Sequence, residues 1–284
     1  MAQDDQQART FLRNAIAKHQ DALITTTTAL VRIPSPNPPG HTAHVADAAI
    51  KLLQSIPHAH VSRHETAPGL VSVVARIPSG RPGKRLVFNG HLDTYPLCED
   101  LHWTVPPTGG VHKDGKIYGR GVCDMKGGIA ASITAARMLA EHRDLWRGEI
   151  VITLAGDEEN MGSLGTKWLL DNVEEAKGDA VICGDVGSAR VVRFGEKGFV
   201  WIAVEAEGVA AHGAHVHKGV NAVRHLRKAL DAVESLEGTV VDGPRDVGEA
   251  IDAAAIVSES LSGEVMRGRN VIFACRWVFR RMTS

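Results

Sequence analysis

The sequence predicts an α/β protein, in which a mostly parallel β-sheet with flanking helices is followed by a smaller α+β unit. Strand-like and helical segments alternate through the first part of the chain, which is typical of such sheets. The strand-like runs there are apolar almost throughout, as strands covered on both faces are. From about residue 196 apolar and polar side chains alternate instead. We therefore expect two domains, 1–195 and 196–284, which also suits the length of the chain.

Two helices are predicted before the first strand. Residues 6–31 space apolar side chains among polar neighbours, which favours a long helix. The segment SPNPPG at 35–40 ends it, because prolines and glycines crowded together cannot continue a helix. Residues 42–55 then resume a helical pattern.

Four strands are predicted for the first domain, and the first three are expected to be buried. The runs at 70–77 and 85–93 are β-branched and apolar with PSGRPG between them, so we expect two adjacent strands. The remaining elements are strands at 149–156 and 179–185, and helices after the DMKGG motif and at 163–173.

The second domain is predicted to have the order strand, helix, strand, strand. Residues 197–208 alternate like a strand with one solvated face. Residues 221–236 carry Val223, Leu226 and Leu230 at helical spacing. Two further strands are expected at 250–263 and 269–279.

The composition is that of an ordinary globular protein and argues against several partners. A formal net charge of −1 gives no reason to expect nucleic acid or an anionic membrane as partner. No apolar run reaches the ~18 residues of a transmembrane helix. The amino-terminal residues are acidic and polar, so we expect no secretory signal and a cytoplasmic protein.

The cysteines indicate neither a zinc knuckle nor a disulfide framework. Cys98, Cys123, Cys183 and Cys275 are scattered without a CxxC spacing. We expect buried free thiols in a reducing compartment.

Four short acidic and histidine motifs carry the chemistry, and each follows a strand-like run. They are GHLDTYP at 90–96, GVCDMKGG at 121–128, GDEEN at 156–160 and CGDVG at 183–187. Together they supply His91, Asp93, Asp124, Glu158, Glu159 and Asp185. Open α/β sheets place ligands just past the strand ends, so we expect these side chains to lie together. They are nearly sufficient for a two-metal hydrolytic centre.

Each motif taken alone also has a structural interpretation. His91 and Asp93 are two residues apart on a strand and leave the same face, so Asp93 can support the second ring nitrogen of His91. The alternative is a strand-end histidine beside a turn aspartate. Asp124 could simply begin a helix, and the adjacent Glu158 and Glu159 could form a solvated turn. An aspartate before glycine, such as Asp185, is more often a turn former. The coincidence of four motifs after four strands favours the metal centre.

The order and spacing of HxDT, DMKGG and EE resemble the dinuclear zinc amidohydrolases and peptidases. This family includes acetylornithine deacetylase, succinyl-diaminopimelate desuccinylase, aminoacylase and glutamate carboxypeptidase. The resemblance implies a metal-dependent hydrolase that cleaves the amide bond of an N-acyl amino acid or a small peptide. It also implies two Zn²⁺ per subunit, with Co²⁺ or Mn²⁺ as alternatives.

The resemblance implies a role for each residue of the motifs. His91 and Asp185 would bind one metal, Glu159 would bind the other, and Asp124 would bridge both. Glu158 would be the general base, and Asp93 would orient His91.

The segment EGVAAHGAHVHKGVNA at 207–222 resembles the lid, or dimerisation, domain of the family. The resemblance implies a homodimer in which His212 reaches the substrate carbonyl in the partner's site, while His215 and His217 are surface residues. Members of the family continue beyond the lid and supply a last histidine to the second metal. We therefore expect a truncated member, with an incomplete catalytic domain and lid and a weak second metal site. An inactive remnant that keeps the lid, and a mononuclear metal-binding protein without turnover, remain alternatives.

Overall fold

The computed structural model describes residues 2–98, 102–187, 202–236, 239, 245–246, 248–250 and 252–253. The chain divides into two compact units, Met1–Arg193 and Phe194–Ser284. Each unit is described by itself below.

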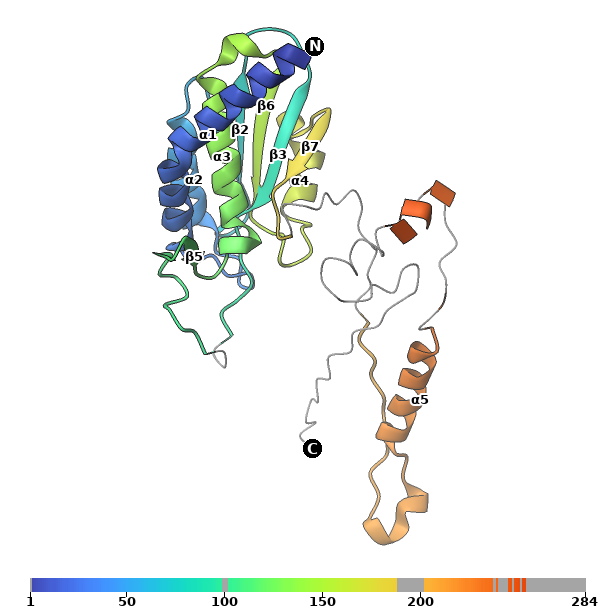
Figure 1. Ribbon diagram of the computed structural model, residues 1–284. Coiled ribbons are helices and arrows are strands. Elements are labelled where there is room, and N and C mark those ends of the chain that lie inside the picture. The colour runs from blue at the N-terminus through green and yellow to red at the C-terminus, as the bar shows by residue number, and fades with distance from the viewer. Residues whose placement is uncertain are drawn as a thin grey trace. The chain divides into compact units, whose positions relative to one another are not determined.

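The first unit is built on a five-stranded sheet with the strand order β1-β2-β6-β3-β7 (Figure 1). The strands are β1 (His60–Ala67), β2 (Leu70–Pro78), β3 (Arg85–His91), β6 (Glu149–Ala155) and β7 (Ala180–Cys183). β2 is antiparallel to both β1 and β6, whereas β3 is parallel to both β6 and β7. Every strand except β2 therefore points the same way, and the expected mostly parallel α/β fold is confirmed.

The expected adjacency of the first two apolar runs is wrong. β6 lies between β2 and β3 and pairs with both, Thr153 standing opposite Val74 and Ile152 opposite Phe88. β6 is buried almost throughout, so both of its edges need partners. β1 was not predicted at all, because its mostly polar sequence HVSRHETA suits an exposed edge strand.

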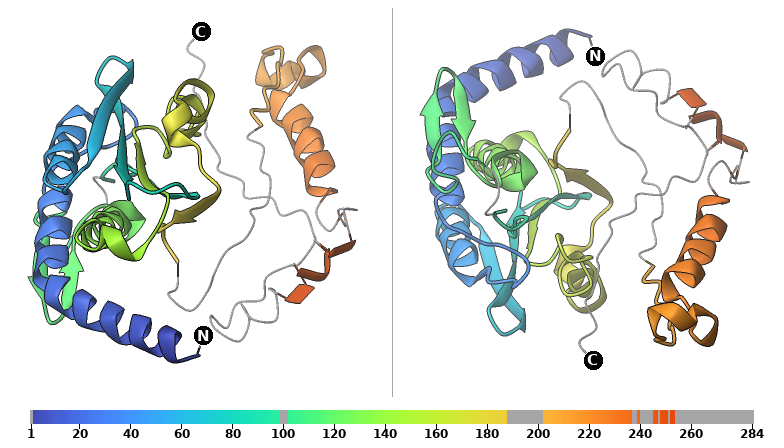
Figure 2. Two further views of the ribbon diagram at one scale, coloured as in Figure 1. Left: turned by 90° about the horizontal axis from the view of Figure 1, so that it is seen from above. Right: turned by 90° about the horizontal axis from the view of Figure 1, so that it is seen from below.

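Helices cover both faces of this sheet (Figure 2). α1 (Ala2–Val31), α2 (Ala43–Gln54) and α3 (Gly127–Ala140) pack on one face, and α4 (Thr166–Asn172) packs on the other. Each face of the sheet has a hydrophobic core, and alternate residues of β2 belong to different cores. Val73 lies in the core that includes α2 and α3, and Val74 lies in the core that includes α4. Coverage of both faces explains why the central strands are continuously apolar.

The edge strand β7 and the described cysteines are exposed. Val181 and Ile182 of β7 are both exposed, in contrast to β6. Cys98, Cys123 and Cys183 are free, as expected, but they are exposed rather than buried. Cys183 is exposed together with the rest of β7. Cys275 lies outside the described residues.

The second unit contains η4 (Gly213–Lys218) and α5 (Ala222–Glu234), so the helix predicted at 221–236 is confirmed. The strand predicted at 197–208 is not formed over 202–208, which pair with no described strand, and 197–201 lie outside the described residues. In the strand predicted at 250–263, the described residues 250 and 252–253 are helical. The strand predicted at 269–279 lies outside the described residues.

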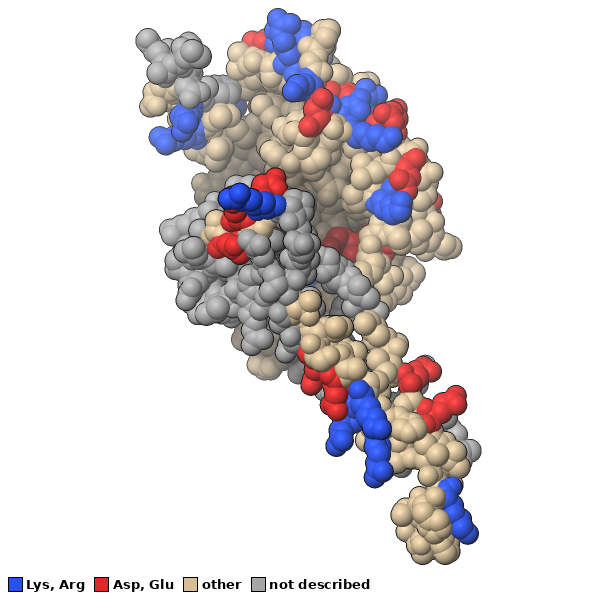
Figure 3. Space-filling model, turned by 90° about the vertical axis from the view of Figure 1, so that its right-hand side faces the viewer, with Lys and Arg blue, Asp and Glu red and all other residues tan. Residues whose placement is uncertain are grey.

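Within the described ranges, no helix is long and apolar enough to cross a membrane. Acidic and basic side chains are interspersed on the face drawn in Figure 3, in keeping with a net charge of −1.

Candidate metal centre

Three parallel strands of the first unit end beside the predicted site residues. His91 is the last residue of β3, Glu158 and Glu159 follow β6, and Asp185 follows β7. Because β6, β3 and β7 are parallel neighbours, their carboxyl ends lie at one edge of the sheet. This is the edge at which α/β sheets place ligands.

Asp124 reaches the site from a different direction. It lies in the short helical turn η1 (Val122–Lys126), which follows the hairpin of β4 (Val111–Lys113) and β5 (Lys116–Tyr118) and not a strand of the main sheet. The backbone of Asp124 is extended, with φ −119° and ψ 90°. Gly121 begins the turn at φ +78°, where a Cβ atom would lie 2.6 Å from Thr94 Cγ2. The turn therefore needs glycine at this position.

His91 is held through one ring nitrogen and presents the other to the carboxylates. Its Nδ1 lies 2.9 Å from the backbone carbonyl oxygen of Asp93 and 3.4 Å from the Oδ1 atom of the same residue. Its Nε2 lies 2.9 Å from Asp124 Oδ1 and 3.9 Å from Glu158 Oε2. A histidine fixed in this way at one nitrogen has the other available for a metal ion.

The carboxylate of Asp93 connects His91 to the two glutamates. The backbone N–H of Glu158 donates to Asp93 Oδ2 over 2.9 Å, and that of Glu159 donates to the same oxygen over 3.0 Å. Asn37 Nδ2 donates to it as well, over 2.9 Å. Burial raises the pKa of Asp93, but the hydrogen bonds from His91 and Asn37 and the charge of His91 hold it below its ordinary value. Asp93 is therefore a charged, immobile support.

Within the described part of the chain, His91, Asp124 and Glu159 form a group that could hold a cation. One ligand atom from each lies within 4.8 Å of those of the other two. Glu159 Oε1 is buried and has no hydrogen-bond partner. A buried carboxylate oxygen without a partner is costly unless a cation completes it. One imidazole and two carboxylates suit a divalent ion such as zinc or manganese. The residues therefore fit a metal ion.

The local charges shift the pKa values of the central groups. Burial lowers the pKa of His91, but the carboxylates of Asp93, Glu158 and Asp124 outweigh burial and raise it to about 9. Burial raises the pKa of Glu158 and so does the charge of Asp185, while His91 lowers it. The pKa of Glu159 is also raised, by burial first and then by the charge of Asp124.

The two remaining predicted residues are Asp185 and His212. Asp185 is exposed, and its Oδ1 accepts a hydrogen bond from the backbone N–H of Val186. It is near enough to influence Glu158, yet it is not a member of the three-ligand group. His212 lies in the second unit, where its Nδ1 accepts a hydrogen bond of 3.2 Å from the N–H of Ala214 at the start of η4. The predicted substrate contact of His212 stays a prediction.

Three buried residues of the site were not identified from the sequence. Asn37 and Asp157 hydrogen bond to each other, and Lys126 Nζ donates to the carbonyl of Ile33 over 2.7 Å. Burial lowers the pKa of Lys126 to about 8, although the charge of Asp93 raises it. Asn37 stands in SPNPPG, a segment that indicates only a break in a helix. Lys126 and Asp157 each lie within a recognised motif, which was the one available indication.

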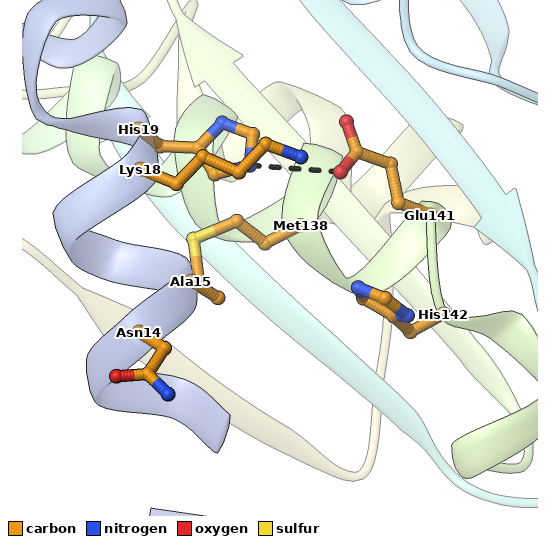
Figure 4. Close-up of a pocket in the computed structure, with 7 residues that line it drawn as sticks. All are labelled: Asn14, Ala15, Lys18, His19, Met138, Glu141 and His142. Carbon is orange, nitrogen blue, oxygen red and sulfur yellow. Dashed lines mark ion pairs between the residues drawn. The ribbon is translucent and has the colours of Figure 1, made fainter. Parts of the chain in front are cut away.

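A hollow of about 230 Å³ elsewhere in the first unit does not belong to this site (Figure 4). It lies between α1 and the carboxyl end of α3, where His19 Nε2 is 3.5 Å from Glu141 Oε2. α3 begins at Gly127, beside the metal centre, and rises ~1.5 Å per residue, so the hollow is roughly 20 Å away.

Comparison with known proteins assigns the chain to a family. Residues 87–260 match the family model described as peptidase family M20/M25/M40. This range is more than half of the chain, so the chain belongs to that family. The resemblance found in the motifs is thereby confirmed.

Two relatives show how much of a family member the chain represents. It is 32% identical over 240 residues to a succinyl-diaminopimelate desuccinylase of Bradyrhizobium sp. (strain ORS 278), covering 81% of this chain and 59% of the relative. It is 35% identical over 162 residues to a protein of the same name from Rhodospirillum centenum, covering 55% and 42% respectively. The chain thus spans about half the length of these curated relatives.

A solved structure supports the fold alone. Human carnosine dipeptidase 1 superposes with a TM-score of 0.59 at 19% identity, covering 92% of this chain and 63% of that one. At this identity the similarity extends to the architecture and not to the substrate.

Proposed function

We propose that the protein is a metal-dependent hydrolase that cleaves the amide bond of an N-acyl amino acid or a small peptide. The observation that carries this proposal is the group of His91, Asp124 and Glu159 at the carboxyl edge of the sheet, with Glu158 beside it. Family membership and the desuccinylase relatives support the class of reaction. They also make N-succinyl amino acids the first substrates to test.

The proposed metal ligands are His91, Asp124 and Glu159, with zinc as the ion and cobalt or manganese as alternatives. A bound ion would supply Lewis acidity, which polarises a carbonyl group and lowers the pKa of water. The resemblance grouped Asp185 with His91 and assigned Glu159 to the other ion, whereas the proposal here groups Glu159 with His91 and Asp124. Asp185 is then a proposed ligand toward a second ion, to which Asp124 would also contribute. The position of Asp185 at the end of β7, close enough to affect the pKa of Glu158, supports this assignment.

Glu158 is the proposed general base. Its side chain is 55% exposed, so water and substrate can reach it. Its raised pKa moves it toward the range in which a carboxylate both accepts and releases a proton near neutral pH. Glu158 would take a proton from the attacking water and deliver it to the leaving amine. Asp93 would keep the imidazole ring of His91 in one orientation during the reaction.

We further propose a homodimer through the second unit, with His212 contacting the substrate carbonyl in the partner's site. Support comes from the resemblance of residues 207–222 to a dimerisation lid and from the exposure of His212. Free Cys98, Cys123 and Cys183 support a reducing compartment, which we propose is the cytoplasm.

A substrate panel tests the proposed reaction. The 284-residue protein, stripped of metal and then reloaded with Zn²⁺, Co²⁺ or Mn²⁺, is assayed on N-succinyl and N-acetyl amino acids and on dipeptides. We expect release of free amine only after reloading, and none from a Glu158→Gln variant prepared in the same way. Metal uptake without hydrolysis of any member would instead favour a metal-binding protein without turnover.

A further inference from the structure

We propose that Asn37 is a positioning residue of the metal centre, whose side-chain amide joins the carboxylates of Asp93 and Asp157 and so fixes the backbone that carries Glu158 and Glu159. The inference deepens the proposed function, on which its catalytic meaning rests. It stands on hydrogen-bond geometry in the first unit.

The amide of Asn37 is buried and divided between two carboxylates. Only 4% of the residue is exposed. Its Nδ2 lies 2.9 Å from Asp93 Oδ2 and 3.0 Å from Asp157 Oδ1. The amino group of asparagine has two protons, so each carboxylate receives one. Asp93 follows β3 and Asp157 follows β6, and one side chain therefore ties together the ends of two neighbouring strands.

The loop that carries Asn37 is held in place without this side chain. The backbone N–H of Asn37 donates to the carbonyl of Thr94 over 3.0 Å, and the N–H of Thr94 donates to the carbonyl of Ser35 over 2.9 Å. Ser35 Oγ donates to the carbonyl of Leu92 over 2.7 Å. Because these bonds already anchor the loop, the side chain of Asn37 is not needed for that purpose and serves the carboxylates.

The two carboxylates in turn fix the turn after β6. Asp93 Oδ2 accepts the backbone N–H groups of Glu158 and Glu159. Asp157 Oδ2 accepts the N–H of Leu164 over 2.9 Å, which closes the following turn. Asn37 supplies the donor that lets two acidic groups lie close together, where they would otherwise repel each other. The directions of the Glu158 and Glu159 side chains therefore depend on Asn37, although its side-chain hydrogen bonds go to Asp93 and Asp157.

The test compares variants of the full 284-residue chain by Zn²⁺ affinity and by hydrogen exchange. Asn37→Ala should weaken Zn²⁺ binding by about tenfold, the lower end of the effect of losing a hydrogen-bond partner of a metal ligand, because Asn37 acts through Asp93. Asn37→Asp, which keeps the shape but replaces the donor with an acceptor, should weaken binding at least as much. The matched control is Ser35→Ala, which removes a buried hydrogen bond of the same loop and should leave Zn²⁺ affinity near that of the wild type.

Hydrogen exchange of the metal-free protein gives a readout that needs neither metal nor turnover. In Asn37→Ala the amides of Glu158 and Glu159 should exchange about tenfold faster, since their acceptor is no longer held, while those of β6 stay protected. If that variant does not fold, Asn37→Ser, which retains one shorter donor, provides the same comparison.

Several results would overturn the assignment. One is an equal effect of Asn37→Ala and Ser35→Ala on Zn²⁺ affinity, and another is a wild-type Zn²⁺ affinity in Asn37→Asp. A third is an unchanged exchange rate of the Glu158 and Glu159 amides in Asn37→Ala. A wild-type protein that binds no Zn²⁺, or binds it without hydrolysis, would contradict the proposed function, and the exchange rates would still decide the role of Asn37.

Discussion

The two halves of the candidate metal centre are held in opposite ways. The side chains of His91 and Asp93 are 3% and 0% exposed and are fixed by hydrogen bonds, whereas those of Asp124 and Glu158 are 47% and 55% exposed. The buried half is therefore part of the folded core, and the exposed half is free to meet an ion, water and substrate. This difference indicates that stability and chemistry can be separated by mutation.

The largest effect on stability is expected at the centre of the buried half. Asp93→Ala leaves the N–H groups of Glu158 and Glu159 and one of the two amide protons of Asn37 without an acceptor. Removing one partner of a buried charged network typically costs about 3–5 kcal/mol, so urea unfolding should show a loss of that size. A loss below about 1 kcal/mol, the value of one ordinary hydrogen bond, would show that Asp93 is not a structural support.

A substitution in the exposed half should lower activity and leave stability almost unchanged. Glu158→Gln should lower the rate of hydrolysis by about 10²–10⁴, the usual effect of losing a general base. Its stability should change by no more than about 0.5 kcal/mol, as for other surface substitutions. Steady-state kinetics and urea unfolding of the same preparation test both statements. A stability loss as large as that of Asp93→Ala would remove the distinction between the halves.

The buried half should also make the metal-free protein sensitive to pH. The pKa of His91 is raised from 6.5 to about 9, so folding favours its protonated form. That stabilisation is fully present below pH 6.5 and is lost as the pH rises through about 9. The free energy of unfolding of the metal-free protein should therefore fall across this interval. His91→Gln, measured in parallel, should lack this part of the slope, and identical slopes in the two proteins would contradict the assignment.

The smallest effect on stability is expected at Asp185. It is exposed, and its carboxylate meets only the neighbouring N–H of Val186 among the hydrogen bonds described. Asp185→Ala should change the free energy of unfolding by no more than about 0.5 kcal/mol. Loss of its charge should lower the pKa of Glu158 in the metal-free protein, because Asp185 raises it, and NMR titration of the Glu158 carboxyl group measures the change. An unchanged pKa of Glu158 would show that Asp185 does not act on it.

The features that depend on local sequence pattern could be predicted from the sequence. The features that depend on contacts between distant segments could not. Continuous apolar runs identified the buried strands, and the motifs at their ends identified His91 and the glutamates. The insertion of β6 between β2 and β3 could not be predicted, because strand order is set by contacts between distant segments. The position of Asp124 could not be predicted either, because it follows the separate hairpin of β4 and β5 and meets the other site residues only through contacts between distant segments. Asn37 was missed because its burial arises only when the SPNPPG segment packs against Leu92 and Thr94.

A metal titration tests the central claim, that His91, Asp124 and Glu159 hold a metal ion while Glu158 is left to react. Metal-stripped wild type, Glu158→Gln and Glu159→Gln are titrated with Zn²⁺ in competition with a chromophoric chelator. We expect one tightly bound ion in the wild type, with a second much weaker, because three ligand atoms lie within 4.8 Å of one another. Glu158→Gln should keep the tight ion, and Glu159→Gln should lose it. Equal loss of zinc from both variants, or two equally tight ions in the wild type, would contradict the account.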